Sequence, residues 1–350
     1  MAGLWDLRPF GTLRHDGAVT ETRALRIGCL GAARIVPAAL TRPAKRLAGV
    51  EVAAIAARDR DRAAQAAARL GIPTVHDSYA SLIADDSLDA VYIPLPNGLH
   101  GHWTIAALEA GRHVLCEKPF TANAEEALEV QQVAERTGFV AMEAFHWRYH
   151  PLADRMASIV ASGELGTVQR IESTMCFPLP RRSDIRWNPT LAGGAMMDAG
   201  CYPVSIVRFL AGAEPTVTSA RAKLRSPEID RYLDAELAFD DGRTGRIVTS
   251  LWSSKVIGFS VTVIGDRATM HVLNPFSPHV FHRLTVRGGD ARHEYVRGLS
   301  TYAYQLAAFR TAVLGGGPVP TSAADAVGNM RVIDAAYRCA GLEPRLPTLL

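Results

Sequence analysis

Short runs of apolar residues alternate with helix-forming segments from residue 24 to residue 144, and this alternation limits the possible folds most. The apolar runs are continuous, which is typical of strands buried on both faces. The predicted strands cover residues 24–30, 50–56, 74–75, 90–93, 113–117 and 140–144. The predicted helices cover residues 34–48, 59–70, 78–84, 102–110 and 123–137. This order indicates a parallel sheet covered on both faces, and hence a doubly wound nucleotide-binding α/β domain over residues 24–148.

The pattern changes after Pro151, where the second predicted domain, residues 149–350, begins to form its own elements. Its predicted helices cover residues 151–162, 195–210, 301–314 and 322–340. Between residues 216 and 296 the apolar runs come in pairs with turn signals between some of them, which favours a mostly antiparallel sheet. Residues 1–23 lack the apolar core of a signal peptide and are expected to form a loose N-terminal arm.

Charge and cysteine content exclude several classes of partner. The net charge is +3 without a basic block, so neither nucleic acid nor an anionic membrane is an expected partner. No apolar run approaches the roughly 20 residues that a membrane-spanning helix needs. The five cysteines are widely spaced without a C-x-x-C pair, which is typical of reduced thiols in a cytoplasmic protein. We therefore expect a cytoplasmic protein that acts on a small molecule.

The turn after the first strand carries part of a dinucleotide-binding fingerprint. In residues 31–36 only the first glycine of G-x-G-x-x-G is present, since Ala33 and Val36 replace the other two. Alanine still lets the backbone come near a pyrophosphate, and a following helix supplies N–H groups. Gly31, Ala33, Arg34 and Ile35 are therefore candidate cofactor-binding residues.

The end of the second strand bears on the choice between NADP and NAD. Ala57 leaves room for a 2′-phosphate, and the guanidinium of Arg58 suits that group, which favours NADP. Asp59 could instead hold the ribose hydroxyls, which would restore a preference for NAD. NADP is the predicted cofactor and NAD is the alternative.

A lysine and a carboxylate–phenol pair form the candidate chemical site. Lys118 stands between Glu117 and Pro119 just past a predicted strand end, where open parallel sheets bind ligands. The bond to Pro119 is a candidate cis peptide. Asp198 and Tyr202 are four residues apart on one predicted helix and are expected to share a face. A nearby ammonium and an oxidised nicotinamide would lower the pKa of the phenol, so Tyr202 becomes a candidate proton carrier.

The sequence resembles the Gfo/Idh/MocA oxidoreductase family over roughly residues 24–345. The resemblance is carried by residues 110–119 (AGRHVLCEKP), 193–202 (GGAMMDAGCY) and 92–100 (YIPLPNGLH), with the first βαβ unit. It implies an N-terminal Rossmann domain and a C-terminal α/β domain whose open, mostly antiparallel sheet binds substrate and often forms the oligomer interface. We accordingly expect a homodimer or homotetramer. Tyr202 is similar to the tyrosine of glucose-fructose oxidoreductase, xylose dehydrogenase and dimeric dihydrodiol dehydrogenase, whereas inositol-dehydrogenase-like members have histidine there.

The resemblance also implies roles for individual residues. Tyr202 would be the general acid/base, Lys118 would tune it, and Asp198 would bind or orient the reacting hydroxyls. Further cofactor contacts are implied for Leu95, Asn97, His100, Glu117, Lys118 and Arg148. Candidate walls of a sugar site are Trp147, Arg186, Trp187 and Trp252. No metal is expected, because no histidine spacing resembles a zinc site.

The leading hypothesis is an NADP-dependent oxidoreductase that moves a hydride between nicotinamide and a secondary alcohol or anomeric carbon of a sugar or polyol. One alternative is a lyase or glycosidase that uses transient oxidation by a tightly held dinucleotide. The other is a catalytically silent dinucleotide-binding protein. Net accumulation of reduced cofactor with a sugar would distinguish the first hypothesis from the second.

Overall fold

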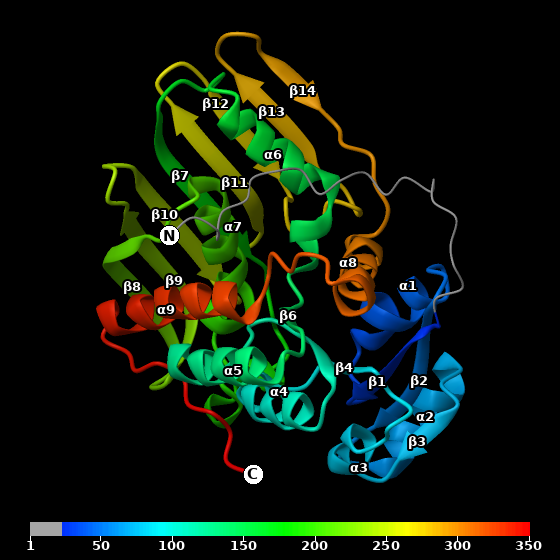
Figure 1. Ribbon diagram of the computed structural model, residues 1–350. Coiled ribbons are helices and arrows are strands. Elements are labelled where there is room, and N and C mark those ends of the chain that lie inside the picture. The colour runs from blue at the N-terminus through cyan, green and yellow to red at the C-terminus, as the bar shows by residue number, and fades with distance from the viewer. Residues whose placement is uncertain (1–22) are drawn as a thin grey trace.

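The computed structural model describes residues 23–350, so the predicted arm lies outside the described residues except for its last position. The N-terminal half forms a six-stranded parallel sheet in the order β3-β2-β1-β4-β5-β6 (Figure 1). Its strands are β1 Leu25–Leu30, β2 Val50–Ala56, β3 Thr74–His76, β4 Ala90–Ile93, β5 His113–Cys116 and β6 Ala141–Glu143. The strand order reverses direction between β1 and β4, which makes the crevice beyond their carboxyl ends the expected ligand site. The predicted doubly wound domain is confirmed.

Helices cover both faces of this sheet. The hydrophobic core on one face of the sheet contains side chains of α3, α4 and α5. The hydrophobic core on the other face contains side chains of α1, α2 and α8 (Thr301–Gly315). The helices of this half are α1 Arg42–Ala44, α2 Arg60–Leu70, α3 Tyr79–Ile83, α4 His100–Glu109 and α5 Ala124–Thr137. Burial of the apolar side chains from both layers stabilises the sheet.

The first helix is shorter than the predicted segment 34–48, and its first turns are wider than those of an α-helix. It begins as a π-helix over Pro37–Thr41 and continues as α1. Pro43 lacks an N–H and its ring opposes the carbonyl of Ala39 four residues earlier, which a wider turn accommodates.

The C-terminal half forms an eight-stranded sheet in the order β14-β13-β12-β11-β7-β10-β9-β8. Only the pair β7 and β10 is parallel within this sheet, so the prediction of a mostly antiparallel sheet is confirmed. Its strands are β7 Val168–Cys176, β8 Thr216–Ser226, β9 Ile229–Ala238, β10 Thr244–Ser250, β11 Gly258–Gly265, β12 Thr269–Leu273, β13 Arg283–Arg287 and β14 Arg292–Glu294. The edge strands β8 and β14 were not predicted, since both lack a buried apolar run.

The remaining helices are α6 Pro151–Ala161, α7 Cys201–Ala211, α8 Thr301–Gly315 and α9 Ala323–Cys339. The helices α6 and α7 bury their apolar faces against the larger sheet, while α9 lies beside α5 (Figure 1). The helix α8 contributes Leu306 and Phe309 to the core of the N-terminal sheet, so the chain returns to its first half after completing the second sheet. None of the described helices is both long enough and apolar enough to cross a bilayer.

Candidate active site

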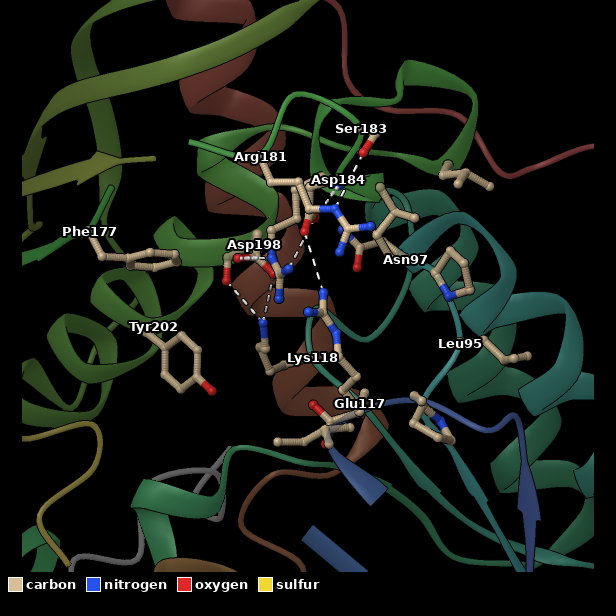
Figure 2. Close-up of a pocket in the computed structure, with 18 of the residues that line it drawn as sticks. Leu95, Asn97, Glu117, Lys118, Phe177, Arg181, Ser183, Asp184, Asp198 and Tyr202 are labelled. Atoms are coloured by element: carbon tan, nitrogen blue, oxygen red, sulfur yellow. Dashed lines mark hydrogen bonds and ion pairs between the residues drawn. The ribbon is translucent and has the colours of Figure 1, made fainter. Parts of the chain in front are cut away.

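A pocket of about 670 Å³ opens beyond the carboxyl ends of β1, β4 and β5, where the two halves of the chain meet (Figure 2). The N-terminal half contributes the turns that follow these strands. The C-terminal half contributes the loop after β7 and the start of α7. The residues that line the pocket are Ala33, Arg34, Ile35, Arg62, Pro94, Leu95, Pro96, Asn97, Glu117, Lys118, Met175, Phe177, Arg181, Ser183, Asp184, Ile185, Arg186, Leu191, Asp198, Tyr202 and Tyr302.

The turn after β1 has the tight geometry that a dinucleotide site needs. Gly31 has φ of +120°, and a Cβ at this position would lie 3.0 Å from Cδ2 of Leu95. Its N–H donates to the carbonyl of Ala56 at 2.7 Å, which ties the turn to β2. Only glycine combines that dihedral angle with that close approach at low cost. Ala33 and Ile35 follow directly in the pocket wall.

The nucleotide end of the pocket is rich in exposed arginine. Arg62 of α2 lines the pocket and donates to the carbonyl of Ala32 at 3.2 Å. Arg58, which sequence analysis singled out, is exposed at the end of β2 and lies outside the lining. Asp59 caps α2 by accepting from the N–H of Arg62 at 3.1 Å, so one carboxylate oxygen is already engaged. Arg62 thus places a guanidinium on the pocket wall, while Arg58 is exposed four residues earlier.

At the other end, three charged side chains form a connected group. The ammonium of Lys118 donates to the carbonyl of Asp198 at 3.0 Å and to its Oδ1 at 3.2 Å. The second carboxylate oxygen of Asp198 lies 2.7 Å from Nε of Arg186. The Lys118–Pro119 peptide bond is cis, as predicted. Figure 2 shows Lys118 and Asp198 pointing toward one another in the middle of the pocket.

This group is held in its charged form by mutual attraction. Burial alone would raise the pKa of Asp198, but the two cations outweigh burial and hold it below its usual value. Burial likewise acts to lower the pKa of Lys118, and the carboxylate of Asp198 more than offsets it, so this pKa is raised. Asp198 therefore fixes the position of the ammonium and is a poor proton acceptor itself.

Tyr202 lies next to this group, on a helix whose first turn is wider than predicted. The predicted helix over 195–210 starts as a π-helix, Met196–Gly200, which contains Asp198, and only then becomes α7. Pro203 opposes the carbonyl of Ala199, the same cause of a wide turn as at the first helix. Asp198 and Tyr202 nevertheless both line the pocket, so the two side chains face the same side as predicted.

The phenol of Tyr202 is neutral in the cofactor-free protein. Its ring is 6% exposed, and burial raises the pKa of Tyr202 well above 10. The ammonium of Lys118 lies 5.3 Å from the centre of the ring, and the hydroxyl lies 3.3 Å from Nε2 of His146. Burial is the largest influence on this pKa, and the expected lowering by Lys118 together with an oxidised nicotinamide stays a prediction for the cofactor-bound protein.

Several other predicted residues support the pocket. His100 is buried, with its ring nitrogens 2.7 Å from the carbonyl of Pro119 and 2.8 Å from that of Leu95, which ties together the ends of β4 and β5. Asn97 lines the pocket and donates to the carbonyl of Ala192 at 3.0 Å. Glu117 accepts a hydrogen bond from the hydroxyl of Tyr92 at 2.7 Å.

Besides Gly31, Arg58 and His100, four more residues predicted for the site lie outside the pocket lining. Trp147 is buried in the core of the C-terminal half, where it packs against Phe209, and the guanidinium of Arg148 lies 3.9 Å from the centre of the Phe209 ring. Trp187 is buried and donates from Nε1 to the carbonyl of Arg181 at 3.1 Å. Trp252 is half-exposed beyond β10. A tryptophan near a predicted site is more often part of the core, and sequence alone does not separate the two cases.

The structure adds pocket residues that the sequence did not suggest. Phe177, Arg181 and Ser183 come from the Pro- and Arg-rich loop after β7, and Tyr302 comes from the first turn of α8. The composition of the loop was a usable signal, since exposed loops that carry arginine and aromatic residues near a site often bind ligands. Within residues 23–350 there is no cluster of three or more His, Cys, Asp or Glu side chains that could hold a metal ion. The five cysteines are free, and only Cys339 is exposed.

The residues present fit a dinucleotide. The tight Gly31 turn gives close backbone access, the pocket continues past the ends of β4 and β5, and guanidinium groups of Arg34 and Arg62 line its outer part. Phosphate groups are bound by such backbone turns and arginines. When bound, a nicotinamide dinucleotide supplies the two-electron acceptor or donor for hydride transfer.

Comparison with known proteins agrees with this geometry. Residues 25–145 match the description "Oxidoreductase family, NAD-binding Rossmann fold", and residues 154–271 match "GFO/IDH/MocA C-terminal domain". The chain is 40% identical to an NADP⁺-dependent D-xylose 1-dehydrogenase of Haloferax volcanii over 318 residues, which cover 90% of this chain and 97% of the relative. It is 31% identical to the trans-1,2-dihydrobenzene-1,2-diol dehydrogenase of Mus musculus over 58% of this chain and 61% of the relative.

Among solved structures, a 3-ketoreductase from Actinomadura kijaniata in complex with NADP and TDP-benzene superimposes with a TM-score of 0.84. The two proteins are 27% identical, and the match covers 90% of this chain and 98% of the reductase. Both the extent of the match and the placement of the pocket therefore lead to one assignment. The chain belongs to the Gfo/Idh/MocA oxidoreductase family and is an NAD(P)-dependent dehydrogenase or reductase.

Proposed function

We propose that this protein is an NADP-dependent dehydrogenase that oxidises a secondary alcohol or the anomeric carbon of an aldose or polyol-like substrate. The observation that carries the proposal is the pocket itself, which joins the Gly31 turn at one end to Lys118, Asp198 and Tyr202 at the other. Similarity to an NADP⁺-dependent D-xylose 1-dehydrogenase supports both the cofactor and a pentose or hexose as substrate.

In this proposal Tyr202 is the general acid/base, because it lines the pocket and the ammonium of Lys118 lies 5.3 Å from the centre of its ring. Lys118 places a positive charge beside the oxygen that becomes a carbonyl. Asp198 has both oxygens engaged by Lys118 and Arg186, so it orients the ammonium more than it binds substrate. Apolar and aromatic surface for a sugar is offered by Met175, Phe177 and Tyr302. These three replace the predicted tryptophan walls.

The preference for NADP is supported by the arginines at the nucleotide end. Arg58 and Arg62 both follow β2, whose last residues are small. Asp59, the residue that would favour NAD, already caps α2. A 2′-phosphate therefore meets two guanidinium groups and one engaged carboxylate.

Assembly as a homodimer or homotetramer and a cytoplasmic location belong to the same proposal. The larger sheet presents ion pairs on one face, such as Arg170 with Glu236 and Arg246 with Asp234, which are partly exposed. Such a face suits a second copy, because opposite charges can pair across the two-fold axis. Light scattering after gel filtration measures the mass, and a monomer would contradict this part of the proposal.

The function is tested with the purified protein and a panel of aldoses and polyols, each with NADP⁺ and with NAD⁺. Mass spectrometry of the protein as purified first identifies any nucleotide that it retains. We expect reduced nicotinamide to accumulate in step with consumption of an aldose such as D-xylose, faster with NADP⁺. Product without net reduced cofactor would indicate transient oxidation instead. Dinucleotide binding without turnover of any sugar would indicate a silent binding protein.

A further inference from the structure

The hydroxyl of Tyr202 has a buried partner that sequence analysis did not assign to the reaction. Its oxygen lies 3.3 Å from Nε2 of His146. His146 begins the short 3₁₀-helix after β6, His146–Tyr149, and is 3% exposed. His146 is not among the residues that line the pocket, whereas Tyr202 is. Tyr202 is therefore the side chain of this pair that a substrate in the pocket can contact.

Four titratable or charged side chains face His146. Tyr202 comes from α7, Tyr302 from α8 with its ring centre 4.2 Å away, and His279 from the loop after β12 with its ring centre 6.5 Å away. The fourth is Lys118. Burial first, and then the neighbouring His279 and Lys118, lower the pKa of His146 to about 3. The imidazole is therefore neutral before the reaction and has one nitrogen free to accept a proton.

The second ring nitrogen of His146 is a buried polar atom without a partner among residues 23–350. Such atoms are uncommon in folded proteins and call for an explanation. The imidazole next to it is that of His279, which is half-buried and has its Nδ1 3.0 Å from Oγ1 of Thr301. One water molecule can span the distance between the two imidazoles. Tyr202, His146 and His279 thus lie in succession, with a 3.3 Å contact between the first two and 6.5 Å between the two imidazole ring centres.

We propose that His146 accepts the phenolic proton of Tyr202 while Tyr202 accepts the proton of the substrate hydroxyl. The substrate C–H bond breaks, its hydrogen and both electrons pass to NAD(P)⁺, and the C–O bond becomes a carbonyl. The hydroxyl proton moves to Tyr202, the former phenol proton moves to Nε2 of His146, and the proton on Nδ1 then leaves toward His279 and water. In the reductive direction each proton moves back along the same path. His146 acts through Tyr202 and is thus a positioning residue.

A relay through His146 avoids the formation of a phenolate at Tyr202. A free phenolate at Tyr202 is unfavourable, since burial raises its pKa and Glu117, Tyr302 and Asp198 raise it further. If the phenol loses its proton to His146 as it gains another, no phenolate needs to form. Burial also disfavours an imidazolium at His146, so the proton on Nδ1 leaves as the phenolic proton arrives at Nε2, and His146 stays neutral.

The kinetic test compares His146→Met with His150→Gln. Methionine keeps volume and removes both nitrogens. His150 is also buried, lies in the same segment, and touches Leu152 and not Tyr202, so its variant controls for general loss of packing. We expect His146→Met to lower kcat for alcohol oxidation roughly 10²-fold at neutral pH, with KM nearly unchanged. Its activity should keep rising at alkaline pH where the parent is flat, because Tyr202 must now ionise directly. His150→Gln should keep the parental profile.

A second measurement needs no turnover. Nitrogen NMR of the cofactor-free protein labelled at histidine reports which ring nitrogen of His146 carries the proton. We expect Nε2 to be unprotonated over the whole range where the protein is folded, and its signal to shift in Tyr202→Phe. A proton on Nε2, or a His146→Met profile that coincides with that of His150→Gln, would overturn the relay.

This inference rests on the proposed role of Tyr202, and the two can fail separately. If Tyr202→Phe keeps its turnover, the proposed function of Tyr202 is wrong. If Tyr202→Phe is inactive while His146→Met keeps the parental kcat and pH profile, Tyr202 stands and the relay alone is wrong.

Discussion

The two ends of the pocket hold their charges in opposite ways. At the reaction end the side chains of Lys118 and Asp198 are 13% and 8% exposed and are already paired. At the nucleotide end the side chain of Arg34 is 80% exposed and its nearest carboxylate, on Asp184, is 3.7 Å away. Charges fixed before substrate arrives are suited to stabilise a transition state, whereas exposed charges gain their partner only when ligand binds. Substitutions at the first end should change kcat, and those at the second should change affinity.

Tyr202→Phe should have the largest effect of the single substitutions. The change keeps the ring and its packing but removes the only proton that Tyr202 can exchange. We expect kcat to fall roughly 10²–10⁴-fold, which is typical of losing a general acid/base. Cofactor affinity, measured by fluorescence titration, should stay close to that of the parent. Turnover near the parental rate would remove Tyr202 from the chemistry.

Lys118→Met should follow, with a loss of about 10²–10³-fold in kcat, in the range seen when one electrostatic stabiliser is removed. Loss of the cation also disfavours the phenolate of Tyr202, so the pH at which the remaining activity rises should move upward. Because Asp198 neutralises much of this charge, we expect that movement to be smaller than for an unpaired ammonium.

Lys118→Arg is the matched control, since it keeps the charge but replaces a compact ammonium with a planar fork and should rescue only partly. If Lys118 had only a structural role, Lys118→Met would give the opposite result. Melting temperature would fall, while specific activity and the pH profile of the folded fraction would match the parent.

The reaction end could be predicted from sequence because its residues follow strand ends, where a parallel sheet brings them together. Lys118 after β5 and Asn97 after β4 line the pocket for that reason. The helix carrying Asp198 was predicted less well. The π-helix there depends on Pro203 opposing a carbonyl four residues earlier, an effect that a pattern of apolar residues does not reveal. His146 was also missed as a partner of Tyr202, since they are 56 residues apart and only packing brings them together.

The nucleotide end was harder to predict because its residues are exposed and weakly constrained. Sequence analysis chose Arg58 for its place after a strand, whereas Arg62, one helical turn later, lines the pocket. The loop after β7 closes the same region from the other half of the chain. Its place over the pocket follows from the strand order of the second sheet, which local patterns do not specify.

Two single variants, Arg58→Ala and Arg62→Ala, test which arginine at the nucleotide end determines the affinity for NADP. Each removes one guanidinium near the predicted 2′-phosphate, so each should weaken NADP more than NAD. We expect about a tenfold loss of NADP affinity, equivalent to about 1.4 kcal/mol, for the residue that contacts the phosphate. Calorimetric titration with both dinucleotides measures this, and kcat at saturating cofactor should be unchanged. Equal losses for both cofactors in both variants, or tighter binding of NAD by the parent, would contradict the preference for NADP.

Arg34→Gln should have the smallest effect, and it is the direct test of whether the two ends are separable. An exposed ion pair contributes about 0–1 kcal/mol, so melting temperature should hardly move. The matched variant is Asp184→Asn, because the buried carboxylate of Asp184 also lies 3.1 Å from Nη1 of Arg186, the residue that holds Asp198. We expect Asp184→Asn to lower both melting temperature and kcat, and Arg34→Gln to raise KM for the cofactor a few-fold at most. If Arg34→Gln lowered kcat as Asp184→Asn does, charge at the nucleotide end would be coupled to the chemistry through Asp184, and the division between binding and turnover residues would have to be given up.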